Sequence, residues 1–203
     1  KTMSALGVYA ASVITYVTVQ NTLGVESLCP TDSYATERQI HAVMNDIRPM
    51  AIKIGMMGNK DTVEAIVKSL SVYYHGNLVV DPVLVSTSGS VLLDNDAIDI
   101  MCRRLLPMAT VITPNIHEAE VLANMKIINK DDIKLAARRI LDYGCGAVLI
   151  KGGHIEGNNK CDILVERKQN GYYEEHEYNS ITVDSKNTHG TGCTLSSAIA
   201  AYL

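Results

Sequence analysis

The sequence predicts an α/β fold in which a mostly parallel sheet is covered by helices on both sides. Short runs of β-branched and aliphatic residues alternate with longer segments whose apolar residues recur at helical spacing. The 203 residues include no Phe and no Trp although 47% of them are hydrophobic, so the core is expected to be aliphatic. Aliphatic strands suit a sheet that is buried on both faces.

Three apolar runs in the first half of the chain are predicted to be strands. They are residues 13–19, which are β-branched almost throughout, residues 51–55, and residues 78–83, which run into a proline. Because helical patterns separate these runs, we expect the strands to belong to the mostly parallel sheet.

Three helices are predicted to accompany these strands. Residues 40–47 and residues 98–105 each carry apolar side chains at the i, i+3, i+4 and i+7 positions of a helix. The helix between them is expected to begin at Asp61, because Asp61 and Glu64 have the spacing of a capping box.

The second half of the chain continues the alternation. Residues 109–115 and 147–153 are predicted strands. A short helix is expected to start near Asn115, and a longer one to run from Asn129 to a stop at Gly144.

The end of the chain departs from strict alternation. Residues 161–167 and 172–178 are separated by polar residues and Gly171, which predicts an antiparallel pair of strands. A last helix follows. One of its faces is expected to carry Leu195, Ala198, Ile199 and Tyr202.

Composition excludes several classes of function. The net charge is −4 with no block of like charges, so a nucleic-acid surface is not expected. The five cysteines are far apart and odd in number, which argues against a disulfide framework and favours a reducing, cytoplasmic location. We find no apolar stretch of the roughly 18 residues that a membrane span needs, so we expect no membrane partner.

Four polar residues lie at or just after the ends of predicted strands, at the edge of the sheet where α/β proteins bind their ligands. Asp81 is expected either to cap a turn or to serve a metal or phosphate site. Asn115 and Glu118 have capping-box spacing, which is compatible with a carboxylate that also faces the ligand crevice. Lys151 is a mobile cation suited to phosphate, although an exposed lysine that merely closes a strand is the simpler interpretation.

Two further strand ends suggest a site for a heterocycle. Gln20 ends the first strand, and its amide can donate and accept hydrogen bonds at once, as a ring nitrogen and an amino group require. Met56 and Met57 follow the second strand and suit an apolar wall, with core filling as the alternative.

The stretch "NTHGTGCTL", residues 187–195, lies between a polar loop and the last helix. Its two glycines let backbone N–H groups converge at a helix N-terminus, which makes an anion-binding site. Three interpretations remain open. The loop is a phosphate cradle with Cys193 beside a substrate hydroxyl, a thiol-nucleophile site in which His189 is the nearest base, or a helix start with a packed cysteine.

Seven motifs, taken in order and spacing, resemble the hydroxymethylpyrimidine/phosphomethylpyrimidine kinases of bacteria, a thiamine-biosynthesis branch of the ribokinase-like superfamily. The resemblance runs from Lys1 to Leu203. The motifs are "KTMSALGVYAASVIT", "VQNTLGV", "KIGMMG", "DPVLVSTSG", "ITPNIHEAEVL", "VLIKGGH" and "NTHGTGCTLSSAIAA". The resemblance implies a three-layer α/β/α kinase fold.

The resemblance also implies an activity. Members use ATP and Mg²⁺ to phosphorylate 4-amino-5-hydroxymethyl-2-methylpyrimidine and then its monophosphate. Cys193 would occupy the catalytic position, and the anion hole would be formed by Gly190, Thr191 and Gly192. The remaining matched residues divide by ligand. Those expected at the nucleotide are Lys151, Asn115 and Thr188, those at the metal are Asp81 and Glu118, and those at the pyrimidine are Gln20, Met56 and Val83.

Residues 1–203 are expected to form a single kinase domain, and the resemblance implies a homodimer. The family also has a strand and a glycine-rich segment before the position of Lys1, and it continues past the last helix. Both segments lie outside these 203 residues, and we expect the protein itself to contain them.

Three rival functions remain. The nearest is a pyridoxal/pyridoxine kinase of the same superfamily, which also phosphorylates a hydroxymethyl group on a nitrogen heterocycle. A thiol hydrolase or transferase that uses Cys193 is a rival of another class. The third is a ligand-binding relative without catalytic activity.

Overall fold

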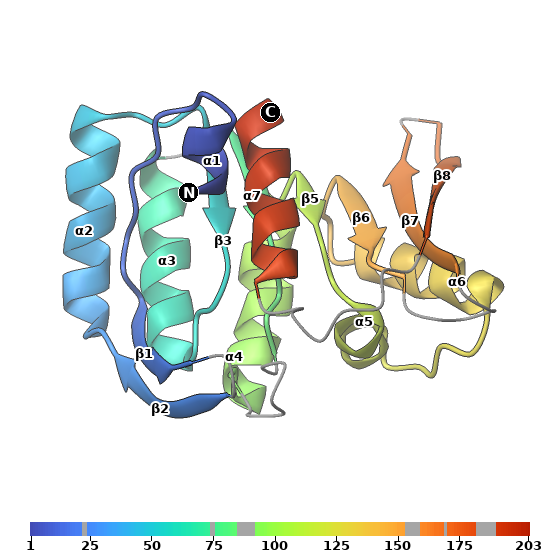
Figure 1. The fold of residues 1–203 in the computed structure, drawn as a ribbon, viewed down its shortest axis with the longest axis horizontal. Coiled ribbons are helices and arrows are strands. Elements are labelled where there is room, and N and C mark those ends of the chain that lie inside the picture. Colours follow the sequence, from blue (N-terminus) through green and yellow to red (C-terminus); the bar gives the residue numbers. More distant parts are fainter. Residues whose placement is uncertain (22–23, 74–75, 85–91, 153–158, 169, 182–189) are drawn as a thin grey trace.

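The computed structural model describes residues 1–203 except 22–23, 74–75, 85–91, 153–158, 169 and 182–189. Six strands form one sheet in the order β3-β4-β5-β6-β7-β8 (Figure 1). The first four are parallel, and the last two pair antiparallel with their neighbours. Their bounds are β3 (Ala51–Ile54), β4 (Asn77–Val80), β5 (Val111–Ile112), β6 (Ala147–Ile150), β7 (Asn159–Arg167) and β8 (Tyr173–Ile181).

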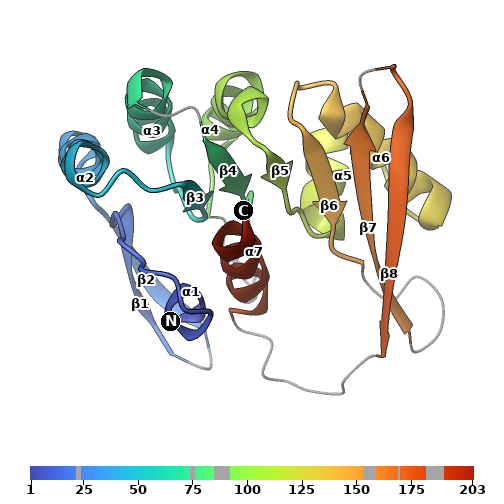
Figure 2. The ribbon, with the colours of Figure 1, turned by 90° about the horizontal axis from the view of Figure 1, so that it is seen from above.

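Helices cover both faces of this sheet, as the sequence predicts, and give three layers (Figure 2). One face carries α3 (Lys60–Tyr73), α4 (Asn95–Ile100), α5 (Ile116–Ala123) and α6 (Lys130–Leu141), with α2 (Ser33–Asp46) packed beside α3. A π-helical turn (Met101–Leu105) and a 3-10 turn (Leu106–Met108) extend α4. The other face carries α1 (Thr2–Ala5) and α7 (Thr191–Tyr202).

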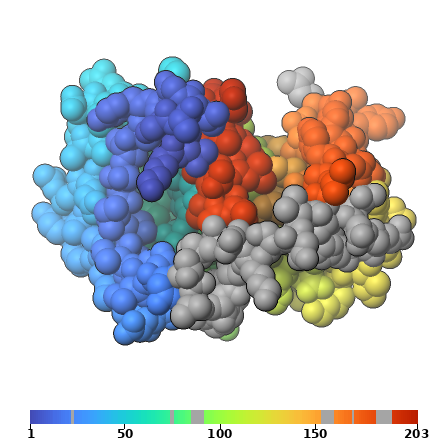
Figure 3. Space-filling model, viewed as in Figure 1, coloured from blue at the N-terminus to red at the C-terminus, as the bar shows by residue number. Residues whose placement is uncertain are grey.

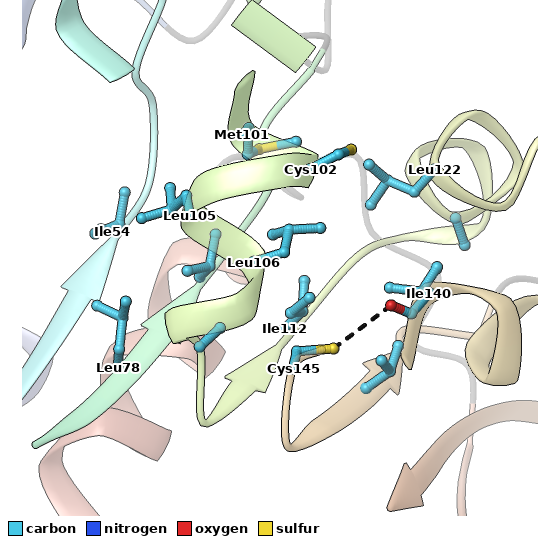
Figure 4. Packing of buried hydrophobic residues seen from close by; sticks show 14 of the residues in the cluster. Ile54, Leu78, Met101, Cys102, Leu105, Leu106, Ile112, Leu122, Ile140 and Cys145 are labelled. Carbon is cyan, nitrogen blue, oxygen red and sulfur yellow. Dashed lines mark hydrogen bonds between the residues drawn. The ribbon is translucent and has the colours of Figure 1, made fainter. Parts of the chain in front are cut away.

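The core is aliphatic and lies on both sides of the sheet. In β4, Leu78 and Val80 join the large cluster beneath α3–α6, whereas Val79 joins a smaller cluster beneath α7. Figure 4 shows the large cluster where Met101, Leu105 and other residues of the extended α4 meet the strands. Burial of successive residues on opposite faces explains why these strands are continuous apolar runs.

All five cysteines are unpaired, and three of them fill the core. Burial raises the pKa of the Cys102 thiol to about 11 and that of the Cys145 thiol to about 12. Cys145 donates a weak hydrogen bond to the carbonyl of Ile140 (Figure 4). Because a thiolate is the reactive form, these buried groups are inert, and the exposed thiols are Cys29 and Cys193.

The prediction that residues 13–19 join the parallel sheet is wrong. The strand here is β1 (Tyr16–Gln20), which pairs antiparallel with β2 (Val25–Pro30) in a separate two-stranded sheet. Val17 is 57% exposed and Val19 44%, so their β-branched side chains reflect strand propensity and not burial. The second strand of this hairpin was not predicted from the sequence.

Several boundaries also differ from prediction. The cap of α3 is Asn59, whose side chain accepts from the N–H of Thr62, and Asp61 lies in the first turn, so the predicted start at Asp61 is wrong. The predicted strand 78–83 ends at Val80 in β4, before Pro82, which lacks a backbone donor. The predicted strand 109–115 shortens to the two residues of β5 for the same reason at Pro114.

Two more predicted ends differ, since the strand predicted over residues 147–153 ends at Ile150 in β6 and the helix expected to stop at Gly144 ends at Leu141 in α6. The remaining predicted elements are confirmed. The helices over residues 40–47 and 98–105 are α2 and the extended α4, and the antiparallel pair is β7 and β8. In the described part of the chain, every helix is too short or too polar to cross a membrane.

Candidate functional site

The candidate site lies where the carboxyl ends of β3, β4 and β6 meet the beginning of α7. Asp81 directly follows β4, and Lys151 directly follows β6. The helix α7 begins after Gly190, whose φ of +80° is a left-handed conformation that favours glycine. Figure 2 shows α7 beside β3 and β4, and Lys151 reaches the start of α7 from the end of β6. The strand-end residues and the glycine loop, far apart in sequence, are therefore neighbours.

Asp81 joins three of these elements. The residue is 2% exposed. Its carboxylate accepts hydrogen bonds from three side chains. Lys151 Nζ lies 2.9 Å from Oδ1 and Thr113 Oγ1 3.2 Å from it, and Ser196 Oγ of α7 lies 3.3 Å from Oδ2. The side chain thus links β4 to β6 through an ion pair with partly buried Lys151, and to α7 through Ser196.

Lys151 is also held against the first turn of α7. A Cβ atom at Gly192 would lie 3.1 Å from Lys151 Nζ and 3.7 Å from Asp81 Oδ2. Glycine at position 192 therefore lets the ammonium group and the helix N-terminus approach each other closely. The positive end of the helix dipole and a cation together favour an anion at this point.

Cys193 lies in the same turn and is exposed. Its sulfur accepts a hydrogen bond from Lys53 Nζ of β3 at 3.6 Å. A Cβ at Gly55 would collide with the Lys53 amino group, so that glycine leaves room for the lysine. We did not predict Lys53 from the sequence. The available signal was a single charged residue within the apolar strand of residues 51–55.

Glu118 is a second buried carboxylate of the site. The predicted capping box is confirmed, because Asn115 N–H donates to Glu118 Oε2 and Glu118 N–H donates to Asn115 Oδ1, both at 2.8 Å. Burial raises the pKa of Glu118 to about 7, while the Asn115 N–H and the Lys151 charge act in the opposite direction. The side chain is thus both a cap and a carboxylate near the Lys151–Asp81 pair.

Asp81 and Glu118 fit a hard divalent cation. Mg²⁺ takes oxygen ligands and is commonly held by one or two carboxylates together with substrate phosphates. Both carboxylates are nearly inaccessible to solvent, and Glu118 has no cation within direct bonding distance among the described residues. A cation there would favour its charged form.

The residues predicted at the pyrimidine are only partly brought together. Gln20 is exposed at the end of β1, where a bulge interrupts the pairing with β2. Thr15 Oγ1 donates to the carbonyl of half-buried Met56 at 2.8 Å, which holds the base of the hairpin against the end of β3. Val83 is half-buried two residues after Asp81. The predicted wall residue Met57 is fully buried in the core, and Thr188 and His189 lie outside the described residues.

A groove of about 710 Å³ contains none of the predicted site residues. It separates α7 from β6–β8 (Figure 3). Leu195 and Ile199 line this groove, and the buried residues of α7 are Ser196 and Ala200 instead. The last helix is confirmed as α7; on its predicted apolar face Ile199 also packs against the cluster of Val79 and Ala200, whereas Tyr202 is 79% exposed.

Replacing Glu118 by Gln is expected to stabilise the protein at alkaline pH. The folded state holds the Glu118 proton more tightly than the unfolded chain, so this group's contribution to stability falls as pH rises from about 4.5 to about 7. The penalty above pH 7 is about 3 kcal/mol. Urea unfolding in EDTA should show a higher free energy of unfolding for Glu118→Gln at pH 8 and little difference at pH 4.

Glu120 of the same helix is the matched control. The Ile127 N–H and Lys126 hold the pKa of its carboxyl below the ordinary value, so Glu120→Gln should lower stability at pH 8. A Glu118→Gln variant that loses stability equally at both pH values would contradict the assigned burial cost.

Comparison with known proteins identifies the group to which this site belongs. A family model described as phosphomethylpyrimidine kinase matches residues 1–203. The chain is 42% identical over 202 residues to the hydroxymethylpyrimidine/phosphomethylpyrimidine kinase of Salmonella typhimurium, covering 99% of this chain and 74% of the relative. It is also 40% identical to the thiamine biosynthesis bifunctional protein ThiED of Geobacter sulfurreducens. That match covers all of this chain but only 40% of the longer protein.

Two solved structures are similar over nearly the whole chain. A phosphomethylpyrimidine kinase from Clostridium difficile has a TM-score of 0.83 at 41% identity and is matched over 99% of this chain and 80% of that one. The pyridoxal kinase of Staphylococcus aureus, in complex with AMP-PCP and pyridoxal, has a TM-score of 0.86 at 28% identity over 99% of this chain and 71% of that one. The ribokinase-like fold predicted from the sequence motifs is thereby confirmed.

Proposed function

Because this chain belongs to the phosphomethylpyrimidine kinase family, we propose that it phosphorylates 4-amino-5-hydroxymethyl-2-methylpyrimidine and then the resulting monophosphate, with ATP as donor, in thiamine biosynthesis. Family membership makes the chain a phosphotransferase. The observation that carries the proposal is the approach of Lys151 and Asp81 to Gly192, which places a cation at the start of α7 next to Cys193.

The phosphate side of the site positions the donor. Lys151 binds the phosphates of ATP together with the backbone of Gly190, Thr191 and Gly192. Asp81 and Glu118 hold Mg²⁺, which neutralises phosphate charge when it is bound. Asn115 and Thr188 lie at the nucleotide. Phosphoryl transfer passes through a loose transition state, so positioning and charge neutralisation supply most of the catalysis.

Cys193 orients the acceptor hydroxyl. In the first step the hydroxymethyl oxygen forms a bond to the γ-phosphorus. The bond from that phosphorus to the bridging oxygen breaks, its electron pair stays on the departing ADP, and the hydroxyl proton is released to solvent. The sulfur accepts a hydrogen bond from that hydroxyl and so aims its oxygen at phosphorus. Gln20 bonds to the ring amino group and nitrogen, and Met56 and Val83 contact the ring faces.

The proposal extends to the oligomeric state and the cellular location of the protein. Residues 1–203 form a single kinase domain in a cytoplasmic homodimer, and the protein has neither a nucleic-acid nor a membrane partner. Light scattering on the full-length protein should give the mass of two chains, and a monomeric mass would contradict the dimer.

Steady-state kinetics with two acceptors test the substrate. The second candidate is a pyridoxal kinase, favoured by the similarity to the S. aureus enzyme at 28% identity. With ATP and Mg²⁺, kcat/KM for the hydroxymethylpyrimidine should exceed that for pyridoxal. A preference for pyridoxal would overturn the proposed substrate but leave the kinase assignment intact.

Replacing Lys151 by Ala is expected to raise KM for ATP by about tenfold or more, because a charge-assisted hydrogen bond to phosphate is worth about 1.5–3 kcal/mol. Titrating ATP at saturating acceptor measures this effect. Lys126→Ala is the control, since that side chain is 81% exposed and pairs with Glu120. An unchanged kcat/KM for ATP in Lys151→Ala would count against a phosphate role.

A further inference from the structure

We propose that Lys53 binds the phosphate group of the monophosphate acceptor and thereby allows the second phosphorylation. The inference rests on the proposed function, because it concerns the second of its two steps. It gives Lys53 a role that differs from that of Lys151. Lys151 serves the donor, and Lys53 serves the charged acceptor.

The position of Lys53 in β3 points its side chain to the catalytic face of the sheet. Ile52 and Ile54 pack into the cluster beneath α3–α6, while Ala51 packs into the cluster beneath α7. Because strand residues alternate between faces, Lys53 shares the α7 face with Ala51. Its ammonium reaches Cys193 Sγ at 3.6 Å, at the place assigned to the acceptor hydroxyl.

The two lysines differ in what balances their charge. Lys151 forms an ion pair with Asp81 at 2.9 Å, so much of its charge is already neutralised within the protein. Lys53 is half-buried, and within the described part of the chain it takes part in no ion pair. Its positive charge is therefore available to an anion that arrives beside Cys193.

The second step creates the need for such a charge. When the acceptor is the monophosphate, a phosphate takes the place of the hydroxyl next to the γ-phosphate of ATP. Two phosphates a few Å apart repel each other by several kcal/mol at the effective dielectric of a protein site. The neutral acceptor of the first step has no such repulsion. A cation on the acceptor side lowers the repulsion, and the Lys53 ammonium lies on that side.

The experiment compares both acceptors in the full-length protein with saturating ATP and Mg²⁺. Lys53→Met removes the charge but nearly keeps the length of the side chain, and Lys53→Arg keeps the charge. Lys126→Met, on the surface, makes the same change in net charge as Lys53→Met. The measured quantity is kcat/KM for the monophosphate divided by kcat/KM for the hydroxymethylpyrimidine.

This ratio should fall at least tenfold in Lys53→Met, mainly through a higher KM for the monophosphate. It should recover towards the wild-type value in Lys53→Arg and stay unchanged in Lys126→Met. A ratio that stays unaltered in Lys53→Met, including an equal loss with both acceptors, would overturn the proposal. Lys53 would then have no specific role with the monophosphate.

The wild-type enzyme separates this inference from the proposed function. If it phosphorylates neither acceptor, the proposed function itself fails. If it phosphorylates both and the Lys53→Met ratio is unaltered, only the role of Lys53 fails. A wild-type enzyme that phosphorylates the alcohol but not the monophosphate also overturns that role.

Discussion

Replacing Cys193 by Ala is expected to lower kcat by about 100-fold, the loss that misplacing a reacting group by about 1 Å produces. The sulfur lies at the start of α7, beside the Lys151–Asp81 pair and in contact with Lys53. Alanine removes the acceptor for the substrate hydroxyl but leaves the backbone of the phosphate cradle in place. Binding of an ATP analogue, measured by calorimetry, should therefore change little.

Cys29→Ala is the matched control, because Cys29 is the other exposed thiol and lies in the β1–β2 hairpin. Undiminished kinase activity in Cys193→Ala would refute the role assigned to the sulfur. The rival thiol hydrolase predicts another result, namely turnover without ATP and a covalent intermediate on Cys193 that mass spectrometry detects.

Replacing Asp81 by Ala is expected to lower the free energy of unfolding by about 3–5 kcal/mol and to abolish activity. The change leaves the partly buried Lys151 ammonium without its carboxylate and removes the acceptor for Thr113 and Ser196. Urea unfolding followed by circular dichroism measures the stability. Asp81→Asn, which keeps the shape and one acceptor, should lose less.

The control for this prediction is an ion pair on the surface. Asp142 is 69% exposed and pairs with Arg167, so Asp142→Ala should cost less than about 1 kcal/mol. Equal losses for Asp81→Ala and Asp142→Ala would contradict the view that Asp81 ties β4 to β6 and α7.

The sequence predicts much of the fold because the central strands are buried on both faces. Continuous apolar runs such as Leu78–Val80 have no other explanation in an α/β pattern. The hairpin was misplaced since β-branched residues have strand propensity whether or not they are buried, as the exposed Val17 shows. For α7, periodicity locates an apolar face but does not say whether a groove or the core receives it; Leu195 lines a groove, whereas Ile199 also packs against the core.

The candidate site was predictable where local chemistry and position agree. Asn115 and Glu118 are recognised by a capping box, and Asp81 and Lys151 by their places at strand ends. Lys53 escaped prediction because it lies inside a strand, and only the long lysine side chain brings its ammonium to the sheet edge. Contacts between Cys193 and a residue 140 positions away leave no local signature.

The most direct test of the central claim is a crystal structure of the full-length protein with the hydroxymethylpyrimidine, Mg²⁺ and a non-hydrolysable ATP analogue. We expect the γ-phosphate at the backbone of residues 190–193 within reach of Lys151, and the hydroxymethyl oxygen within hydrogen-bonding distance of Cys193 Sγ. A hydroxymethyl group bound away from the sulfur, or a triphosphate bound away from the start of α7, would contradict the account.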